Sequence, residues 1–555
     1  MTAPFDPTSN SPQKWPKKWL LAIYLVLLLG LGLRLYKLDE KSLWGDEFAT
    51  IASAQGRSID PVAFADRNLS FDPPAPVPAH VYRDKALIPV SSAPFDCGPT
   101  AAVLKQNVHP PLYFCIMHAF IHRWDTSPTV LRLPSILFGI LCLRALFGIA
   151  LLSCSPIETL LATILMTFSA YQIDHSQDAR PYTLLILLAL FSAWWVQAYI
   201  PLSKASPWQS VIAKRLKGSN LCWLGLLLAA GLYTQYFFIP FIGFVVSYAA
   251  WQHRNDKRFL LGLAGSLLLA ALLFLPWLPT FQAQMHFYAH ENHFTRGLWN
   301  PIKLPETILR DCITFAAPDN AFATGVILVI LFWPFLHWLI TSRKPPQSQF
   351  LIFALWWVIA VFAGQIGIDL IKHTHTIMIR RYTLLAAPGF YLLLSYLVWH
   401  FPVPQKFSAY TLRIRQSVTG LLLIAVATST VSYFRHHHSS DEFKQAAAFI
   451  ANNRQANDVV LVNKTGAVAV GMAYYLPPDT LMLGINANSE ADLKPDSPLL
   501  ATLTPIPAQH PRIWLVFAHN APSTQQRLTG WLAALGYRQA LQNHVPGVET
   551  ALYSR

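Results

Sequence analysis

The chain has 555 residues, of which 53% are hydrophobic and only 13% are charged. This composition excludes an ordinary soluble protein, because the apolar residues occur in runs long enough to span a membrane. The formal net charge of +14 does not indicate nucleic-acid binding, since much of the basic excess lies in short loops between apolar runs and no nucleic-acid-binding motif is present. We therefore expect a membrane protein that does not bind nucleic acid.

The order of apolar runs and basic loops predicts a polytopic α-helical membrane protein with about eleven transmembrane helices. The first run, Trp19 to Leu35, follows three lysines and has no cleavage site after it. We therefore expect a retained helix over about 18–36 with a cytoplasmic N-terminus. Further spans are expected at about 130–152, 157–174, 181–200, 221–238, 239–251, 259–280, 322–342, 350–371, 383–400 and 415–434.

Two domains follow from the hydropathy. A membrane domain is expected over about residues 1–438, and its long first external loop, about 37–128, contains an apolar stretch that should lie in the membrane interface as a helix. About residues 439–555 show the pattern of a soluble extracytoplasmic α/β domain, which we interpret as a cap or acceptor platform. Its strands are expected at about 459–462 and 512–517, and its helices at about 441–452 and 525–535.

Asp46 and Glu47 lie side by side just after the first apolar run, in the stretch Leu43 to Phe48. Ionisable groups at membrane sites are costly, so they are functional candidates by default. Asp46 has the chemistry of a general base, and Glu47 that of a group that orients the base or holds a metal. The alternative interpretation is that both are solvated residues in the first turn of a surface helix, stabilised by its dipole.

Three further external stretches carry polar side chains. His109 precedes two prolines at the start of the interfacial helix, and Asp178 and Arg180 lie in a tight turn between two spans. Arg380 and Arg381 oppose the positive-inside trend, and guanidinium groups suit phosphate binding. The alternatives are an incidental histidine, a solvated turn that pairs its own charges, and arginines that anchor a helix at the interface.

Six motifs, in matching order over about the first 400 residues, resemble those of the GT-C membrane glycosyltransferases. The nearest resemblance is to bacterial members of the protein O-mannosyltransferase group (glycosyltransferase family 39), which includes the lipid A aminoarabinose transferase and the RgtA/B/C/D-like enzymes. The motifs are Trp-Gly-Asp-Glu at 44–47, His-Pro-Pro-Leu-Tyr at 109–113, Leu-Arg-Leu-Pro-Ser at 131–135, Ser-Gln-Asp-Ala-Arg-Pro-Tyr at 176–182, Tyr-Thr-Gln-Tyr-Phe at 233–237 and Arg-Tyr at 381–382.

This resemblance implies a GT-C fold and transfer of a sugar from a polyprenyl-phosphate carrier on the extracytoplasmic face of a bacterial plasma membrane. By position, Asp46 matches the family's catalytic aspartate, Glu47 the acid beside it, and His109 the histidine of its His-Pro-Pro motif. Tyr236 lies in a stretch that often reads Tyr-Thr-His-Tyr, so Gln235 replaces a commonly seen histidine. The acceptor, which could be a lipid, a glycan or a protein, is not implied.

The chemistry of the residues agrees with this implication. A sugar on a phosphate carrier has a good leaving group, so the acceptor hydroxyl needs a base, which Asp46 would supply in an inverting attack. Charge that develops on the departing phosphate needs preorganised cations, and Lys372, Arg380 and Arg381 are the candidates. A divalent metal is the alternative, with the ligands Glu47 or His373 and His375.

Two other functions are considered. A transporter or flippase of lipid-linked sugars would place ionisable groups at the bilayer midplane and show repeated halves, and we find no internal repeat. A non-catalytic membrane scaffold leaves the gathering of polar residues on one face unexplained. Cys97 and Cys312 both fall in loops expected outside, where a disulfide between them is an open option.

Overall fold

The computed structural model describes residues 17–58, 75–91, 93–105, 107–199, 222–290, 297, 299–318, 320–341, 348–436, 439–464, 466–485, 497–518 and 522–555. The chain forms two compact units. Unit 1 consists of Met1–Tyr36, Ser135–Gln177 and Pro181–Arg435. Unit 2 consists of Lys37–Pro134, Asp178–Arg180 and His436–Arg555, so it joins the long segment after the first apolar run, a three-residue turn and the C-terminal residues.

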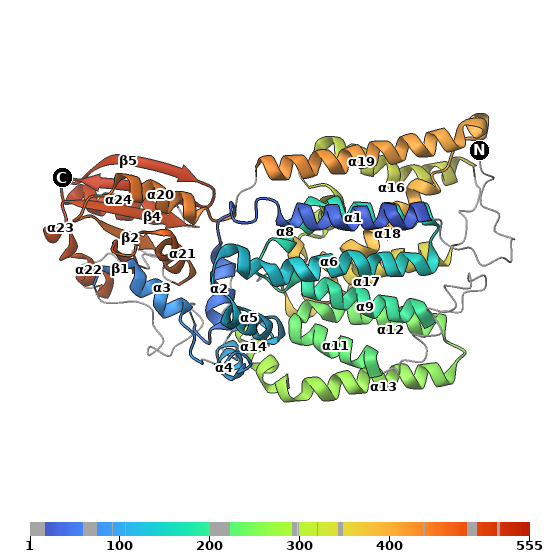
Figure 1. Ribbon diagram of the computed structural model, residues 1–555, viewed down its shortest axis with the longest axis horizontal. Coiled ribbons are helices and arrows are strands. Elements are labelled where there is room, and N and C mark those ends of the chain that lie inside the picture. Colours follow the sequence, from blue (N-terminus) through green and yellow to red (C-terminus); the bar gives the residue numbers. More distant parts are fainter. Residues whose placement is uncertain are drawn as a thin grey trace. The chain divides into compact units, whose positions relative to one another are not determined.

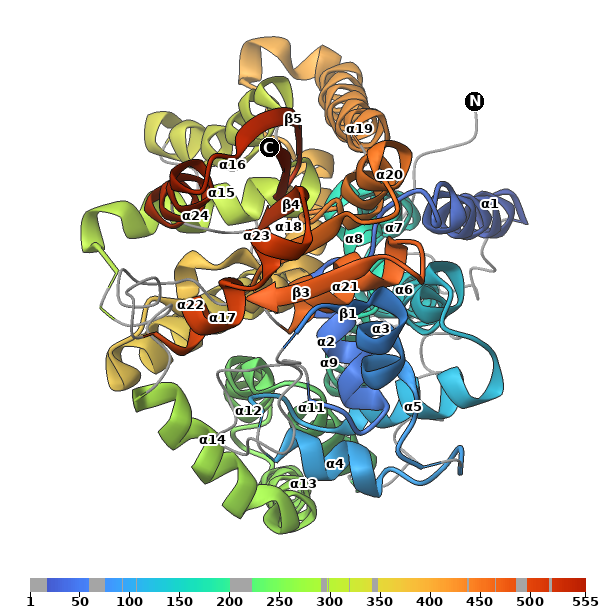
Figure 2. The ribbon, with the colours of Figure 1, turned by 90° about the vertical axis from the view of Figure 1, so that its left-hand side faces the viewer.

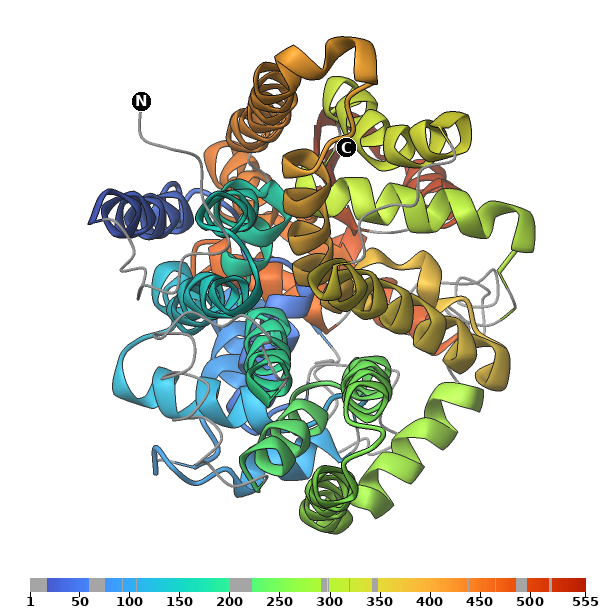
Figure 3. The same ribbon diagram turned by 90° about the vertical axis from the view of Figure 1, so that its right-hand side faces the viewer.

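Unit 1 is built from apolar helices that lie side by side in Figure 1 and are seen nearly end-on in Figure 3. Among the described residues, five helical segments are long and apolar enough to cross a membrane, as a multi-pass membrane protein requires. They lie in α6 (Pro128–Ser153), α13 (Lys257–Phe274) with its continuation η3 (Leu275–Trp277) and α14 (Leu278–His290), α16 (Ala321–Thr341), α17 (Gln349–Lys372), and α19 (Thr411–Arg435) with the preceding η9 (Gln405–Tyr410).

Shorter apolar helices complete this bundle. They are α1 (Lys17–Leu35), α7 (Pro156–Phe168), α9 (Tyr182–Tyr199), α11 (Cys222–Thr234), η2 (Tyr236–Phe238) with α12 (Ile239–Gln252), and η8 (Leu384–Ala386) with α18 (Ala387–Trp399). The connecting helices are α8 (Ala170–Ser176), η5 (Pro301–Lys303), α15 (Leu304–Ala316), η6 (Thr376–Met378) and η7 (Arg380–Tyr382).

One predicted span is interrupted. The helix expected over 157–174 stops at Phe168, because Ser169 adopts an extended backbone conformation with ψ of 115°. The Ser169 hydroxyl accepts a hydrogen bond from the N–H of Gln172 at 3.2 Å and donates one to the carbonyl of Phe315 at 2.6 Å. It therefore caps a second helix, α8, as serine commonly does at helix N-termini.

The C-terminal residues of unit 2 form an α/β sheet whose strand order is β1-β3-β2-β4-β6-β5. The central strands β3 (Leu481–Ile485), β2 (Val459–Asn463) and β4 (Arg512–Ala518) are parallel, and their nearly continuous burial explains why they read as hydrophobic runs. The antiparallel hairpin of β5 (Arg538–Val545) and β6 (Val548–Ser554) extends the sheet. The helices are α20 (Phe443–Asn453), α21 (Ala467–Tyr475), α22 (Pro498–Leu503), α23 (Ile506–Gln509) and α24 (Pro522–Ala534).

The long segment between the first apolar run and α6 is part of the same unit. It contains α2 (Gly45–Ala54), α3 (Ala79–Leu87), α4 (Gly98–Leu104) and α5 (Leu112–Arg123), while residues 59–74 lie outside the described residues. Its short strand β1 (Val77–Pro78) pairs antiparallel with β3, as Figure 2 shows. The Tyr82 hydroxyl accepts a hydrogen bond from the N–H of Gly484 at 2.8 Å. The sheet of the C-terminal residues therefore includes a strand from near the N-terminus.

The cysteine pairing differs from the option considered above. Cys97 forms a disulfide with Cys115, with a Cα–Cα distance of 5.4 Å, and Cys312 is a buried free thiol on α15. The structure therefore contradicts a disulfide between Cys97 and Cys312. The physical reason is local packing, because Cys97 precedes α4 and Cys115 lies on α5, and these two helices pack against each other in unit 2.

Candidate active site

Asp46 and Glu47 occupy the first turn of α2, where the helix dipole favours negative charge. Their surroundings differ sharply. The side chain of Asp46 is 35% exposed, while that of Glu47 is fully buried. Glu47 accepts a hydrogen bond from the N–H of Trp44 at 3.2 Å, as the acid of a capping box does. The two adjacent carboxylates therefore differ in accessibility, because Asp46 is partly exposed and Glu47 is enclosed by the protein.

Glu47 forms a bidentate ion pair with Arg132, which is also fully buried. Arg132 Nε donates to Glu47 Oε1 at 2.9 Å and Nη2 donates to Oε2 at 2.8 Å. The same guanidinium donates to three backbone carbonyls of the segment between the first apolar run and α2, those of Leu38, Lys41 and Ser42, at 2.7 to 3.0 Å. A buried charge can be retained when it is paired in this way. Because Glu47 belongs to α2 and Arg132 to α6, the ion pair joins the N-terminal ends of these two helices.

The turn Asp178–Arg180 also contacts Asp46 and Glu47. The N–H of Ala179 donates to Glu47 Oε1 at 2.8 Å. Arg180 Nη1 donates to the Asp46 carbonyl at 3.1 Å and to the Thr50 hydroxyl at 2.9 Å, and its Nη2 lies 3.5 Å from Asp46 Oδ2. Asp178 forms a buried ion pair with Lys41 at 3.0 Å. Arg180 is thereby held against the helix that carries Asp46.

His109 lies beside Arg180, with 3.5 Å between His109 Nε2 and Arg180 Nη2. Its ring stacks on Phe114 of α5 at a centroid distance of 5.8 Å. The His-Pro-Pro stretch therefore places this imidazole at the N-terminal end of α5, next to the guanidinium that contacts Asp46.

These contacts bring five of the sequence-predicted site residues together in unit 2: Asp46, Glu47, His109, Asp178 and Arg180. The cluster contains three acidic side chains and, with Arg132, Lys41 and Arg180, three basic ones. Such a charge balance lets the buried members remain ionised. What the cluster offers a ligand is the Asp46 carboxylate, which can accept a proton from a bound hydroxyl group.

The other predicted residues lie in unit 1. Arg380 Nε is 3.9 Å from Oδ1 of Asp311, whose side chain is fully buried on α15. The Thr383 hydroxyl donates to Asp311 Oδ2 at 3.0 Å. Burial raises the pKa of Asp311 to about 6, while this hydrogen bond and the charges of Arg380 and Arg310 act in the opposite direction. The side chain of Arg380 is 39% exposed.

Arg381 and Tyr236 belong to stretches that meet in unit 1. The Arg381 guanidinium lies 5.6 Å from the ring of Tyr382, and Tyr382 stacks on Phe237 with centroids 3.9 Å apart. The Tyr236 hydroxyl accepts a hydrogen bond from Trp277 Nε1 at 2.9 Å and donates to Gln284. These protein contacts give Tyr236 a structural role that its position in the motif did not reveal.

Lys372 is the last residue of α17, and His373 and His375 follow it. Lys372 is exposed in the last turn, and His373 ends the helix with a left-handed backbone, φ 52°. His375 Nδ1 lies 3.3 Å from the carbonyl of Gly297. The turn after the helix is held by the buried Asp369, whose carboxylate accepts hydrogen bonds from the N–H groups of Thr376 and Ile377 at 3.0 and 2.8 Å.

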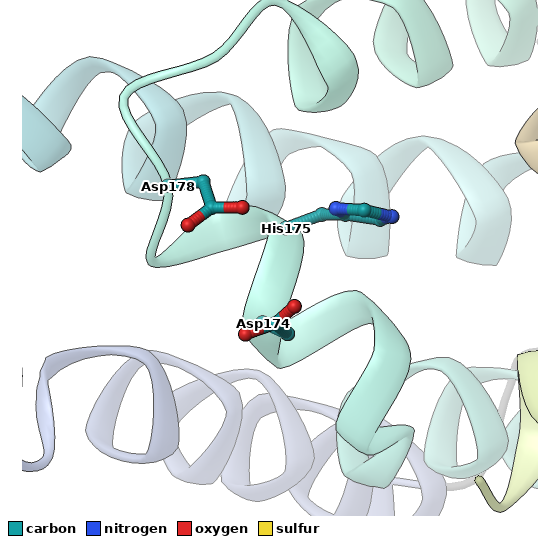
Figure 4. Close-up of side chains that lie close together, drawn as sticks. All are labelled: Asp174, His175 and Asp178. Carbon is teal, nitrogen blue, oxygen red and sulfur yellow. The ribbon is translucent and has the colours of Figure 1, made fainter. Parts of the chain in front are cut away.

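Of the predicted metal ligands, Glu47 is already engaged by a basic side chain of the protein. Both Glu47 oxygens accept hydrogen bonds from Arg132, so this carboxylate is paired with a guanidinium and is not available to a metal cation. Figure 4 shows a different group of acidic and histidine side chains, at the end of α8 and in the turn after it. Its two carboxylates have protein partners, because Asp174 accepts from the Tyr433 hydroxyl at 3.1 Å and Asp178 pairs with Lys41.

Four residues of these networks were not named as site residues from the sequence, although Arg132 lies in the Leu-Arg-Leu-Pro-Ser motif: Lys41, Arg132, Asp311 and Asp369. Arg132 and Asp369 lie within apolar runs, and a charge inside such a run is a signal that could have found them. Lys41 and Asp311 lie in polar segments, where a charged side chain is ordinary. Only the packing of the chain identifies their partners.

No protein-family model and none of the curated proteins matches the sequence. Solved structures do match. ArnT from Cupriavidus metallidurans bound to undecaprenyl phosphate aligns with a TM-score of 0.50 at 12% identity, over 97% of this chain and 98% of that chain. Its apo state aligns with a TM-score of 0.51 at 12% identity over the same shares. The archaeal oligosaccharyltransferase AglB from Archaeoglobus fulgidus, in complex with an inhibitory peptide and a dolichol-phosphate, gives 0.49 at 10% identity over 97% and 74%. The likeness to ArnT shows a shared fold, and the predicted GT-C fold is confirmed.

Proposed function

We propose that this GT-C membrane protein is a glycosyltransferase that moves a sugar from a polyprenyl-phosphate carrier to a hydroxyl group of an acceptor. The proposal extends the shared fold to a shared type of donor, since the ArnT structure of that fold is bound to undecaprenyl phosphate. We further propose about eleven spans, with unit 2 on the extracytoplasmic face of a bacterial plasma membrane. The acceptor is a lipid, a glycan or a protein of the cell envelope.

One observation carries the assignment of the base. Asp46 is partly exposed, while its neighbours Glu47, Arg132 and Arg180 are buried and hold its helix from several directions. A catalytic carboxylate must be reachable by substrate and also fixed in orientation. Asp46 meets both requirements, whereas Glu47 meets only the second. We therefore assign Asp46 as the general base and Glu47 as a residue that positions it.

In the proposed reaction the acceptor oxygen attacks the anomeric carbon of the sugar as its proton moves to the Asp46 carboxylate. The bond between that carbon and the phosphate oxygen breaks, and the configuration inverts. The carrier leaves as a polyprenyl phosphate that has gained one negative charge, and Asp46 has lost one by accepting the proton. The step needs no general acid, because the leaving phosphate is already a weak base.

Arg180 has a specific part in this mechanism. Its guanidinium contacts both the backbone and the carboxylate of Asp46, so it orients the base. His109, which lies next to Arg180, is the candidate for a hydrogen bond to the acceptor. Asp178 supports the turn through its ion pair with Lys41.

For the donor phosphate we propose Arg380 and Arg381 of unit 1, with Lys372 as a further cation. Guanidinium groups bind phosphate oxygens through two parallel N–H donors. The partial exposure of Arg380 leaves its charge accessible to a ligand. Charge that builds on the departing phosphate is stabilised by such preorganised donors.

The test uses purified protein in lipid, a panel of radiolabelled polyprenyl-phosphate sugars and a crude membrane acceptor extract. Asp46→Asn should abolish transfer to the acceptor, and Asp39→Asn should not, because Asp39 is an exposed aspartate of the same loop. Substantial turnover by Asp46→Asn would remove Asp46 as the base. If no label moves but the carrier crosses sealed vesicles, the protein is a transporter of lipid-linked sugars instead.

A further inference from the structure

The helix that carries Asp46 receives its cap from the other end of the chain. A helix begins with N–H groups that lack partners inside the helix, and in α2 the N-cap residue is Trp44, whose indole can donate but cannot accept. The N–H of Gly45 donates to Asp441 Oδ2 at 2.9 Å. Asp441 therefore takes the place of a capping side chain, 396 residues away in the sequence.

Asp441 is itself held firmly. Its side chain is buried, and the next residue, Glu442, donates from its N–H to the carbonyl of Pro546 at 2.9 Å in the turn between β5 and β6. Gly547 of that turn has φ of +74°, and a Cβ at this position would overlap the carbonyl oxygen of Ser440. The close approach of this turn fixes the backbone on both sides of Asp441.

Further contacts attach the segment around Asp46 to the same part of unit 2. The N–H of Leu43 donates to the Tyr475 hydroxyl at 2.9 Å. Phe48 is fully buried and contacts the rings of Phe443, Tyr474 and Tyr475 with centroids 5.5 to 6.5 Å apart. Asp46 thus lies between two anchored positions, one before it and one after it in the chain.

Gly45 leaves room for the cap. A Cβ at Gly45 would lie 3.3 Å from Asp441 Oδ2, which is tight for a carbon and a carboxylate oxygen. This contact explains the glycine in the Trp-Gly-Asp-Glu motif of this chain. Without a side chain at Gly45, the Asp441 carboxylate approaches the backbone N–H unhindered.

We propose that Asp441 is a positioning residue for Asp46, and that the C-terminal α/β part of unit 2 sets the orientation of the base. This inference rests on the proposed function. Through the N–H of Gly45, Asp441 fixes the turn from which the Asp46 side chain projects. Losing it should lower kcat, because catalysis falls steeply when a reacting group is displaced by as little as an ångström. It should leave the donor KM unchanged.

The test compares the full-length variants Asp441→Ala and Asp441→Asn in the radiolabel transfer assay. Asp441→Ala should lower kcat by on the order of 10- to 100-fold without changing the donor KM. Asp441→Asn keeps an oxygen that can accept from Gly45 and should restore most of kcat. Gly45→Ala places a methyl group against the intact Asp441 carboxylate and should also lower kcat. This variant tests the same contact by changing Gly45 instead of Asp441.

Asp458→Ala is the matched control. Asp458 is a buried aspartate of the same α/β part that pairs with Arg512 at 2.9 Å and accepts from Trp514 Nε1 at 2.8 Å. Its loss should destabilise the sheet but leave kcat unchanged. Amide hydrogen exchange separates the two effects, because Asp441→Ala should speed exchange in the first turn of α2 and Asp458→Ala should speed it in β2 and β4.

The outcomes separate the two proposals. If wild type transfers no label from any donor, the proposed function falls, and the role of Asp441 in orienting a base falls with it. If wild type transfers label and Asp441→Ala keeps its kcat, or loses no more than Asp458→Ala, only the positioning role is overturned. Equal kcat values for Asp441→Ala and Asp441→Asn would also overturn it, because the cap requires an acceptor oxygen.

Discussion

Replacing either partner of the Glu47–Arg132 pair should loosen the first turn of α2. Glu47→Gln keeps the shape of the side chain but leaves the Arg132 guanidinium buried without its counter-charge. Arg132→Met keeps much of the volume but leaves the Glu47 carboxylate without its two strongest donors. It also removes the donors to the carbonyls of Leu38, Lys41 and Ser42.

The size of the effect follows from the burial of both groups. Both side chains have no exposed surface, and removing one partner of a buried ion pair costs about 3–5 kcal/mol, because the remaining charge stays out of water. The double variant removes both charges, so it should be less destabilised than the sum of the single variants by about 2–3 kcal/mol. Isolated surface pairs are worth about 0–1 kcal/mol.

Amide hydrogen exchange in the peptide that covers Gly45–Ala54 measures the free energy of local opening. A change of about 3 kcal/mol corresponds to exchange that is more than about 100-fold faster. The control is the Arg454–Asp479 pair of the same unit, whose Asp479 side chain is 73% exposed. Arg454→Met should change the exchange of this peptide by no measurable amount.

Two results would refute the reasoning. Single variants at Glu47 and Arg132 that exchange no faster than Arg454→Met would mean that the buried pair does not hold α2. Effects that simply add in the double variant would mean that the two charges are not coupled, and that each acts through its backbone partners alone.

Three other predictions concern pH, the donor and the disulfide. Because burial raises the pKa of Asp311 to about 6, its ionisation should destabilise the fold by up to about 3 kcal/mol as pH rises from about 4 to 7. The midpoint of thermal unfolding should therefore fall with pH in wild type more than in Asp311→Asn, and equal slopes would contradict this. Arg380→Ala should raise the donor KM about tenfold, whereas Arg310→Ala should not, and equal KM values would remove Arg380 from the phosphate site. Non-reducing digestion should yield one peptide that links Cys97 to Cys115, and free thiols there would contradict the pairing.

The sequence predicted the local features well. Most of the predicted apolar runs form helices, although the run over 157–174 is broken at Ser169. The strands near 459 and 512 follow from buried hydrophobic runs. The separate motifs around Asp46, His109 and Arg180 were singled out as site candidates, and unit 2 brings them together.

What the sequence did not predict are contacts between distant segments. Strand β1 has only two residues, too few for an alternating pattern to be visible. Cys115 lies in an apolar stretch where nothing indicates a pairing partner. Asp441 is one acid in a polar segment, and its contact with Gly45 spans most of the chain. Such partners depend on how the chain folds back, which no local pattern encodes.

The shared sheet of unit 2 has a consequence for how the protein is made. Strand β1 and α2 are synthesised early, but β3, Asp441 and Phe443 are added only after all the intervening helices. Because contacts of such high sequence separation form late and slowly, the helix that carries Asp46 stays without its cap until the last segment of the chain has emerged. A chain that stops before residue 436 would lack Asp441 and strand β3, so the cap of α2 and the pairing of β1 can form only after synthesis has passed these residues.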